Sequence, residues 1–209
     1  KDYQNADMSN AIQEMMGFGK FDATTLEKYL DGKTAYVNYG VAKDFETITG
    51  GSNKKDLETL FQLIYVGFTA PKKDSSGFLS FISSQKGFIQ NRSNDPNSVF
   101  HDSIQYIMSG YNIRGKSLNE QELNKIEMLK AHQIFKERFK DPSDFTFVLV
   151  GSFNLDSIKP LIESYLGGIS NEMKHESFTA NSIVTPKGKL IKTIEKGNNP
   201  RSTVQLMWT

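Results

Sequence analysis

The chain has 209 residues, of which 37% are hydrophobic and 11% aromatic, so it carries enough apolar material for one domain with a real core. Its 25 basic and 24 acidic side chains nearly cancel, and no block of like charges occurs, which argues against a nucleic-acid binder. The absence of cysteine excludes disulfides, thiolate catalysis and cysteine-ligated zinc. No apolar run reaches the ~18 residues that a membrane-spanning helix needs, so no membrane span is predicted in this segment.

The first part of the chain predicts two short helices followed by a hairpin. Residues 7–16 form the first predicted helix, and the second carries Thr24 and Glu27 at the spacing of a capping box. Residues 34–43 and 45–49 alternate in polarity and are rich in β-branched and aromatic side chains. That pattern predicts a pair of antiparallel strands.

A long helical region is predicted next. An amphipathic helix, capped by Ser52 or Asn53 and broken at Ala70-Pro71, carries one apolar stripe at helical spacing. The stripe consists of Leu57, Leu60, Phe61, Ile64 and Phe68. Further helices are predicted over residues 75–92, 96–110, 119–126 and 128–139.

The clearest local pattern is a strand followed by a helix. Residues 145–150 (FTFVLV) predict a buried strand, Gly151 a tight exit, and Asn154 or Asp156 the start of a helix that closes at Gly167-Gly168. The last predictions are a linker over residues 170–187 and two strands over residues 190–196 and 202–208. The sum is an α+β domain with a mostly antiparallel sheet packed by several helices.

No chemical motif stands out. Gly151 follows a predicted strand, but neither a dinucleotide fingerprint nor a P-loop surrounds it. The histidines, His101, His132 and His175, are far apart and form no H-E-x-x-H or H-x-x-E-H arrangement that would present two imidazoles to zinc. Each reads as an ordinary surface or partly buried histidine. G-x-S-x-G is also absent, although a Ser-His-Asp triad is defined by geometry and sequence alone leaves it open.

The order of elements resembles that of insulinase/pitrilysin-type zinc peptidases, in the branch of pyrroloquinoline-associated zinc peptidases. Residues 56–71 (DLETLFQLIYVGFTAP) resemble the helix after that family's central hairpin. Residues 143–170 (SDFTFVLVGSFNLDSIKPLIESYLGGIS) are similar to its strand, turn and helix. The resemblance covers about residues 7–170, and it implies an insulinase/mitochondrial-processing-peptidase-like domain.

The resemblance also locates a degenerate zinc motif. Catalytic domains of that family carry H-x-x-E-H on their first helix, and here residues 11–15 (AIQEM) take its place. Ala11 and Met15 replace both histidines, and Glu14 matches the general base. Alanine has no donor atom and a thioether is a poor zinc ligand. The region of the third ligand, residues 85–92, has no carboxylate. We therefore expect no catalytic residue and no metal in this segment, with Glu14 as a helix surface residue and zinc in the catalytic half of the parent protein.

The resemblance implies two parts along the chain. Residues 1–186 are expected to form an inactive repeat domain from the second half of such a peptidase. Residues 187–209 are expected to be a linker and the first, truncated strand of the following domain. A chain beginning with Lys1 is expected to be a fragment that lacks the domain's own first strand. The strand predicted over residues 202–208 is expected to compensate by pairing with this domain's sheet.

The implied function is that of a non-catalytic domain of a zinc-dependent endopeptidase, forming part of the substrate chamber and the peptide-binding wall. Its expected partners are the catalytic half of the same polypeptide and a peptide substrate, and nucleic acid is not among them. The alternative is a catalytically dead structural or assembly module of the same fold. An unrelated α+β ligand-binding domain is a third reading. Related bacterial peptidases are often exported, which favours a periplasmic or otherwise exported protein.

Overall fold

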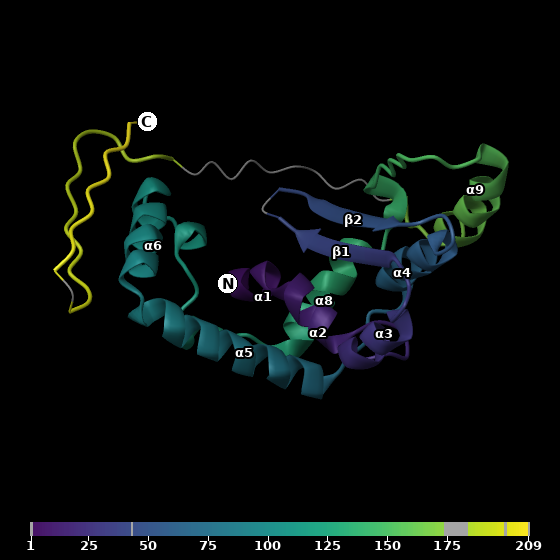
Figure 1. Ribbon diagram of the computed structural model, residues 1–209, viewed down its shortest axis with the longest axis horizontal. Helices are drawn as coiled ribbons and strands as arrows, with labels where there is room; N and C mark the ends of the chain where they lie inside the picture. The colour runs from purple at the N-terminus through teal and green to yellow at the C-terminus, as the bar shows by residue number, and fades with distance from the viewer. Residues whose placement is uncertain (1, 43, 174–183, 199, 209) are drawn as a thin grey trace. The chain divides into compact units, whose positions relative to one another are not determined.

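The computed structural model describes residues 2–42, 44–173, 184–198 and 200–208 (Figure 1). The chain forms two compact units: unit 1 contains residues 1–81 and 126–179, and unit 2 contains residues 82–125 and 180–209. The boundary between them falls inside the long helix α5 (Ser75–Asn94). The division expected at residue 186 stays a prediction.

Unit 1 is built on the predicted hairpin. Strand β1 (Ala35–Val41) pairs with β2 (Glu46–Ser52) in an antiparallel two-stranded sheet, with Tyr39 opposite Ile48. Helix α4 (Leu57–Thr69) follows β2, and the Asp56 carboxylate before it accepts a hydrogen bond of 2.8 Å from the N–H of Thr34. That bond ties the start of the hairpin to the start of the helix. The predicted α+β class is confirmed.

Aromatic side chains fill the core of unit 1 between the hairpin, α4 and helix α8 (Met128–Phe139). Tyr39 lies at its centre, 5% exposed, with its ring centroid 5.6 Å from that of Phe135 and 5.4 Å from that of Phe139. Its hydroxyl donates to the carbonyl of Leu63 in α4 at 2.8 Å. Gly67 lies directly against the Tyr39 hydroxyl, leaving no room for a Cβ. The remaining buried members of this core are Phe18, Phe68 and Ile169.

Three short helices precede the hairpin: α1 (Tyr3–Asp7), α2 (Ser9–Met16) and α3 (Ala23–Leu30). The helix predicted over residues 7–16 is present as α2, and α1 is an additional short helix before it. The capping-box prediction for α3 is wrong, because Asp22 caps it by accepting from the N–H of Thr25 at 2.8 Å. Asp22 supplies the favoured N-cap carboxylate two residues before Thr24, so Thr24 already lies inside the helix.

The last elements of unit 1 pack against α4, through contacts between α4 and the π-helix η3 described below. After the 3₁₀ turn η2 (Pro142–Asp144) and an extended segment, α9 (Leu155–Leu161) begins at its predicted cap, Asn154, whose side chain accepts from the N–H of Asp156 at 2.7 Å. The π-helix η3 (Ile162–Leu166) continues it.

Unit 2 consists of the second part of α5, helix α6 (Pro96–Met108), the 3₁₀ turn η1 (Ile113–Gly115) and helix α7 (Glu120–Leu123). The predicted proline in the first turn of α6 is confirmed. The Arg92 guanidinium forms a bidentate ion pair with the Asp102 carboxylate. The same carboxylate also accepts a hydrogen bond from the hydroxyl of Ser117 at 2.7 Å. These contacts join α5, α6 and the loop after η1.

Three predicted strands are wrong. Residues 145–150, 190–196 and 202–208 make no strand pairing with any part of the chain that the structure describes. The expected pairing of residues 202–208 with the sheet of unit 1 stays a prediction. Residues 145–150 are also not buried, since Val148 is 79% and Val150 93% exposed. Their apolar and β-branched composition favours extended backbone, but a strand forms only when a partner strand takes its hydrogen bonds.

Candidate functional site: a groove along the free edge of β2

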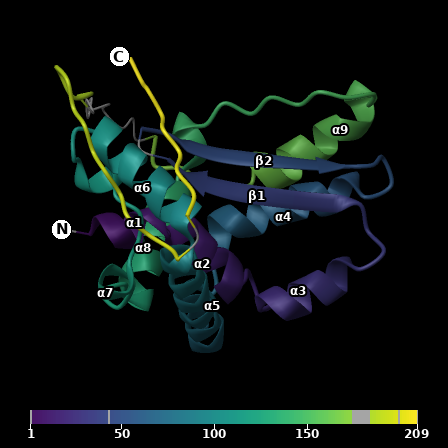
Figure 2. The same ribbon diagram turned by 60° about the vertical axis from the view of Figure 1, so that its left-hand side comes forward.

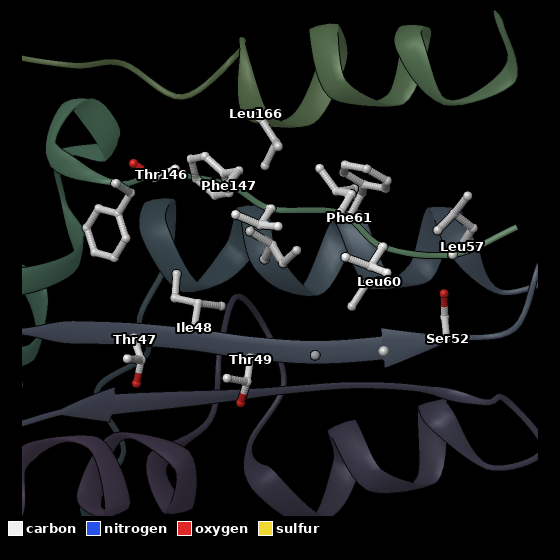
Figure 3. A pocket seen from close by; sticks show the side chains of 18 of the residues that line it. Thr47, Ile48, Thr49, Ser52, Leu57, Leu60, Phe61, Thr146, Phe147 and Leu166 are labelled. Carbon is white, nitrogen blue, oxygen red and sulfur yellow. The ribbon is translucent and has the colours of Figure 1, made fainter. Parts of the chain in front are cut away.

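A groove with a cavity volume of about 940 Å³ runs along β2 in unit 1. Figure 3 shows β2 on one side, the extended segment of residues 144–153 on the other, and α4 behind. We call it the β2 groove. All of its lining residues belong to unit 1.

The side formed by β2 carries a row of outward-facing backbone groups, and those of residues 48, 50 and 52 make no backbone hydrogen bond to any other described residue. The bonds from Ala42 N–H to Phe45 C=O (2.9 Å) and from Asn53 N–H to Thr34 C=O (3.2 Å) fix which residues of the hairpin face inward. Antiparallel partners alternate between hydrogen-bonded and non-bonded pairs. Residues 47, 49 and 51 therefore bond to β1, while the N–H and C=O groups of residues 46, 48, 50 and 52 point outward to the groove.

The opposite side is unpaired as well. Residues 146–150 are extended, and their backbone groups make no hydrogen bond to any other described backbone group. In addition, the Ser52 hydroxyl oxygen is buried on the groove side and has no hydrogen-bond partner among the described residues. Both sides of the β2 groove thus offer donors and acceptors to an absent chain segment.

The floor of the groove is apolar. Helix α4 contributes Leu60, Phe61 and Ile64, and α9 with η3 contributes Ile158 and Leu166. Figure 3 shows Ile48 pointing toward this floor and Thr47 and Thr49 pointing away from it. The charged lining residues lie toward the ends of β2 and at the start of the opposite segment: Asp44, Glu46, Lys54 and Asp144. An uncharged, extended segment with alternating apolar side chains matches this lining.

A polar clamp holds the far wall of the groove on α4. The hydroxyl of Tyr165, in η3, donates to the Glu58 carboxylate at 2.8 Å and accepts from the Gln62 amide at 3.1 Å. The Tyr165 ring also stacks on Phe61, with centroids 6.4 Å apart. The Tyr165 contacts therefore hold η3 against α4 beside Phe61, which lines the floor of the groove.

The degenerate zinc positions lie elsewhere, on α2. Ala11, Glu14 and Met15 are on its surface, and Met15 is 37% exposed. No group of three His, Cys, Asp or Glu side chains able to hold a metal occurs among the described residues. The side chains at residues 11 and 15 lack the donors that zinc requires, so they do not fit that metal.

Glu14 lies beside the outer edge of β1. Burial raises the pKa of its carboxyl group, and the backbone N–H of Tyr39 pulls that pKa down by a smaller amount. As a residue, Glu14 remains exposed to solvent on the surface of α2. The charge of Glu14 in turn helps burial to raise the pKa of Tyr39. Glu14 is thus a helix-surface carboxylate that faces a strand.

A buried polar pair next to these positions has no signal in the sequence. Gln13, with 0% exposure, donates to the carbonyls of Gly17 (2.8 Å) and Lys72 (2.9 Å). Its carbonyl oxygen lies 2.8 Å from Nδ1 of His132 in α8, which is also buried. Burial lowers the pKa of His132, and the positive charges of Lys73 and Lys136 lower it further. Of the other histidines, His101 lies on α6 and His175 lies outside the described residues.

Known proteins resemble this chain at both the sequence and the fold level. Residues 131–209 match the family described as Peptidase M16 inactive domain. A zinc protease PQQL-like protein of Arabidopsis thaliana is 35% identical over 117 residues, covering 54% of this chain and 12% of that relative. The probable zinc protease PqqL of Haemophilus influenzae is 22% identical over 219 residues, covering 100% of this chain and 22% of that relative. The chain therefore spans less than a quarter of either relative.

Two solved structures share the fold. One is a mutant of the ferredoxin protease FusC in complex with Arabidopsis ferredoxin, with a TM-score of 0.67 at 17% identity over 87% of this chain and 20% of that one. The other is the periplasmic protease PqqL of Escherichia coli, with a TM-score of 0.67 at 21% identity over 86% of this chain and 20% of that one.

Within the residues that the structure describes, no helix is both long and apolar enough to cross a membrane. The family match over residues 131–209 and the two curated relatives support a place for this chain among the M16, or insulinase-type, peptidases, as an inactive domain of the PqqL-like kind, and the two solved structures show that it shares their fold.

Proposed function

We propose that this chain is a non-catalytic domain of a zinc-dependent endopeptidase, in which it forms part of the substrate chamber and contributes the β2 groove to a peptide-binding wall. Zinc and the catalytic residues belong, in this proposal, to the other half of the same polypeptide. The observation that carries it is that the outward backbone groups of residues 48, 50 and 52 and those of residues 146–150 line opposite sides of the groove without a backbone hydrogen bond to any other described residue. An extended peptide satisfies both rows by adding a strand.

The proposed binding mode is selective for conformation more than for sequence. Backbone hydrogen bonds along β2 recognise any extended chain, and each contributes a net ~0.5–1.5 kcal/mol. The apolar floor of Leu60, Phe61 and Ile64 then favours apolar side chains at every second position. A folded protein cannot present such a strand, so the peptide has to be unfolded locally.

Amide hydrogen exchange of the chain, with and without a probe peptide, tests this proposal. The probe is a synthetic peptide in which valine and threonine alternate between terminal lysines. We expect it to protect the amides of Glu46, Ile48, Gly50 and Ser52. The amides of Thr47, Thr49 and Gly51 already bond to β1 and serve as internal controls. Protection of neither set, or of both sets equally, contradicts strand addition along β2.

The structural alternative makes a different use of the same groove. If the longer protein is a scaffold in which one of its own strands fills the groove, the outward amides of β2 are protected in that protein before any peptide is added. Exchange measured on the longer protein alone therefore separates the two functions. A peptide-binding wall requires that these amides exchange freely without peptide and slowly with it.

A further inference from the structure

The two outer edges of the hairpin have different neighbours at the position where Tyr39 pairs with Ile48. Tyr39 of β1 and Ile48 of β2 are directly opposite each other, and both belong to the set whose backbone groups point outward. On the β2 side, Ile48 faces the open groove. On the β1 side, helix α2 covers the edge, and Figure 2 shows α2 on the side of β1 with the 144–153 segment and α9 on the side of β2.

Two side chains of α2 reach the backbone of Tyr39. The amide of Asn10 donates to the Tyr39 carbonyl at 3.2 Å. One helical turn later, the Glu14 carboxylate lies near enough to the Tyr39 N–H for that donor to lower the pKa of the carboxyl group. Residues at i and i+4 of a helix lie on one face, so both side chains meet the same strand position.

We infer that Asn10 and Glu14 close the outer edge of β1, so that an extended peptide strand can join this sheet along β2 only. The inference rests on the proposed function for the β2 edge, but the closure of the β1 edge is independent of it. Tyr39 is near the middle of a seven-residue strand. Blocking it leaves too few consecutive outward groups on either side for an added strand. Covering an edge with a helix and a charged side chain is a known way to prevent unwanted strand pairing.

The closure gives Glu14 a role that its zinc-motif position does not suggest. On α2 it faces a strand edge instead of a metal, and Asn10 shares that task. Together the two residues determine where a peptide binds, and they do so as positioning residues, because neither lies in the β2 groove. An open β1 edge would allow a second peptide, or a second copy of the chain, to pair there.

The test compares the wild-type chain with the Asn10→Ala/Glu14→Ala double variant by amide exchange, using the valine–threonine probe peptide. In the wild type we expect the outward amides of β1, those of residues 35, 37, 39 and 41, to gain no protection from the peptide. In the double variant we expect them to gain at least tenfold protection, and the peptide stoichiometry to rise from one to two. The matched control is Gln133→Ala/Glu137→Ala, which removes an amide–carboxylate pair bonded within α8 at 2.7 Å and leaves the β1 edge closed.

Each result decides the inference. The inference is overturned if the peptide protects the outward amides of β1 in the wild type. It is also overturned if the double variant folds and the peptide does not protect those amides. If the double variant does not fold, the single Asn10→Ala variant, which loses only one hydrogen bond, is expected to show the same new protection at a lower level. If the peptide protects the outward amides of β1 in the double variant but not those of β2, the proposed peptide-binding wall along β2 is refuted. The inference that Asn10 and Glu14 close the β1 edge would still hold.

Discussion

Replacing Gln13 with leucine tests the buried polar pair that joins α2 to α8. Leucine has nearly the same size as glutamine but offers no hydrogen bond. The carbonyl of Lys72 and Nδ1 of His132 then lose the partner that Gln13 provides. The carbonyl of Gly17 loses one donor but keeps the N–H of Lys72 at 3.2 Å. Leaving a buried polar group unsatisfied costs ~1–3 kcal/mol, so two such groups predict a loss of roughly 2–6 kcal/mol in the free energy of unfolding.

The loss should be read from unit 1 alone, because the chain forms two units. We expect hydrogen exchange of peptides from α2 and α8, measured at increasing urea, to show a lower midpoint in Gln13→Leu than in the wild type. Gln133→Leu is the matched control, since Gln133 is exposed on α8 and bonds only to Glu137. That change is expected to cost at most ~0.5 kcal/mol.

The reasoning is refuted if Gln13→Leu loses no more stability than Gln133→Leu. That result would mean that the pair contributes no more than an apolar contact of the same shape. Matched replacement of both partners by apolar groups can be nearly neutral. A Gln13→Leu/His132→Leu double variant should therefore recover part of the loss, and the recovery measures the cost of the unpaired imidazole.

Three further predictions follow from single contacts. Burial and two lysines lower the pKa of His132 in the folded chain. As the pH falls below the ordinary value of 6.5, the unfolded chain therefore binds a proton at His132 before the folded chain does, and the stability of unit 1 should decrease. The His132→Gln variant should show a weaker dependence of stability on pH. Gly67→Ala should cost about 1–3 kcal/mol by overpacking against the Tyr39 hydroxyl, measured by urea unfolding; an unchanged midpoint would contradict this contact. The Ala11→His/Met15→His double variant recreates H-x-x-E-H on α2. It should bind Co²⁺ more tightly than either single variant in a spectroscopic titration, because histidines at i and i+4 lie on one face of a helix. Equal affinities of the double and single variants would contradict that placement.

The helices and the hairpin could be predicted from the sequence, because their signals are local. The stripe from Leu57 to Phe68 gives α4, Asn154 caps α9, and Pro96 opens α6, each through contacts within a few residues. Alternation over the two strands gives the hairpin, whose partners are neighbours in the chain. The resemblance of residues 56–71 and 143–170 to insulinase-type peptidases also rests on element order, which the sequence contains.

Tertiary structure alone decided which extended segments become strands and which strand edge stays open. Residues 145–150 have the composition of a buried strand, yet they line a groove, because a strand depends on hydrogen bonds to a partner that its own sequence does not name. The contact of Asn10 with Tyr39 and that of Gln13 with His132 join residues 29 and 119 positions apart, and no periodic pattern marks either. Sequence therefore determined the helices, the hairpin and the resemblance to insulinase-type peptidases, while long-range packing determined which edge of the hairpin faces the groove and which edge faces α2.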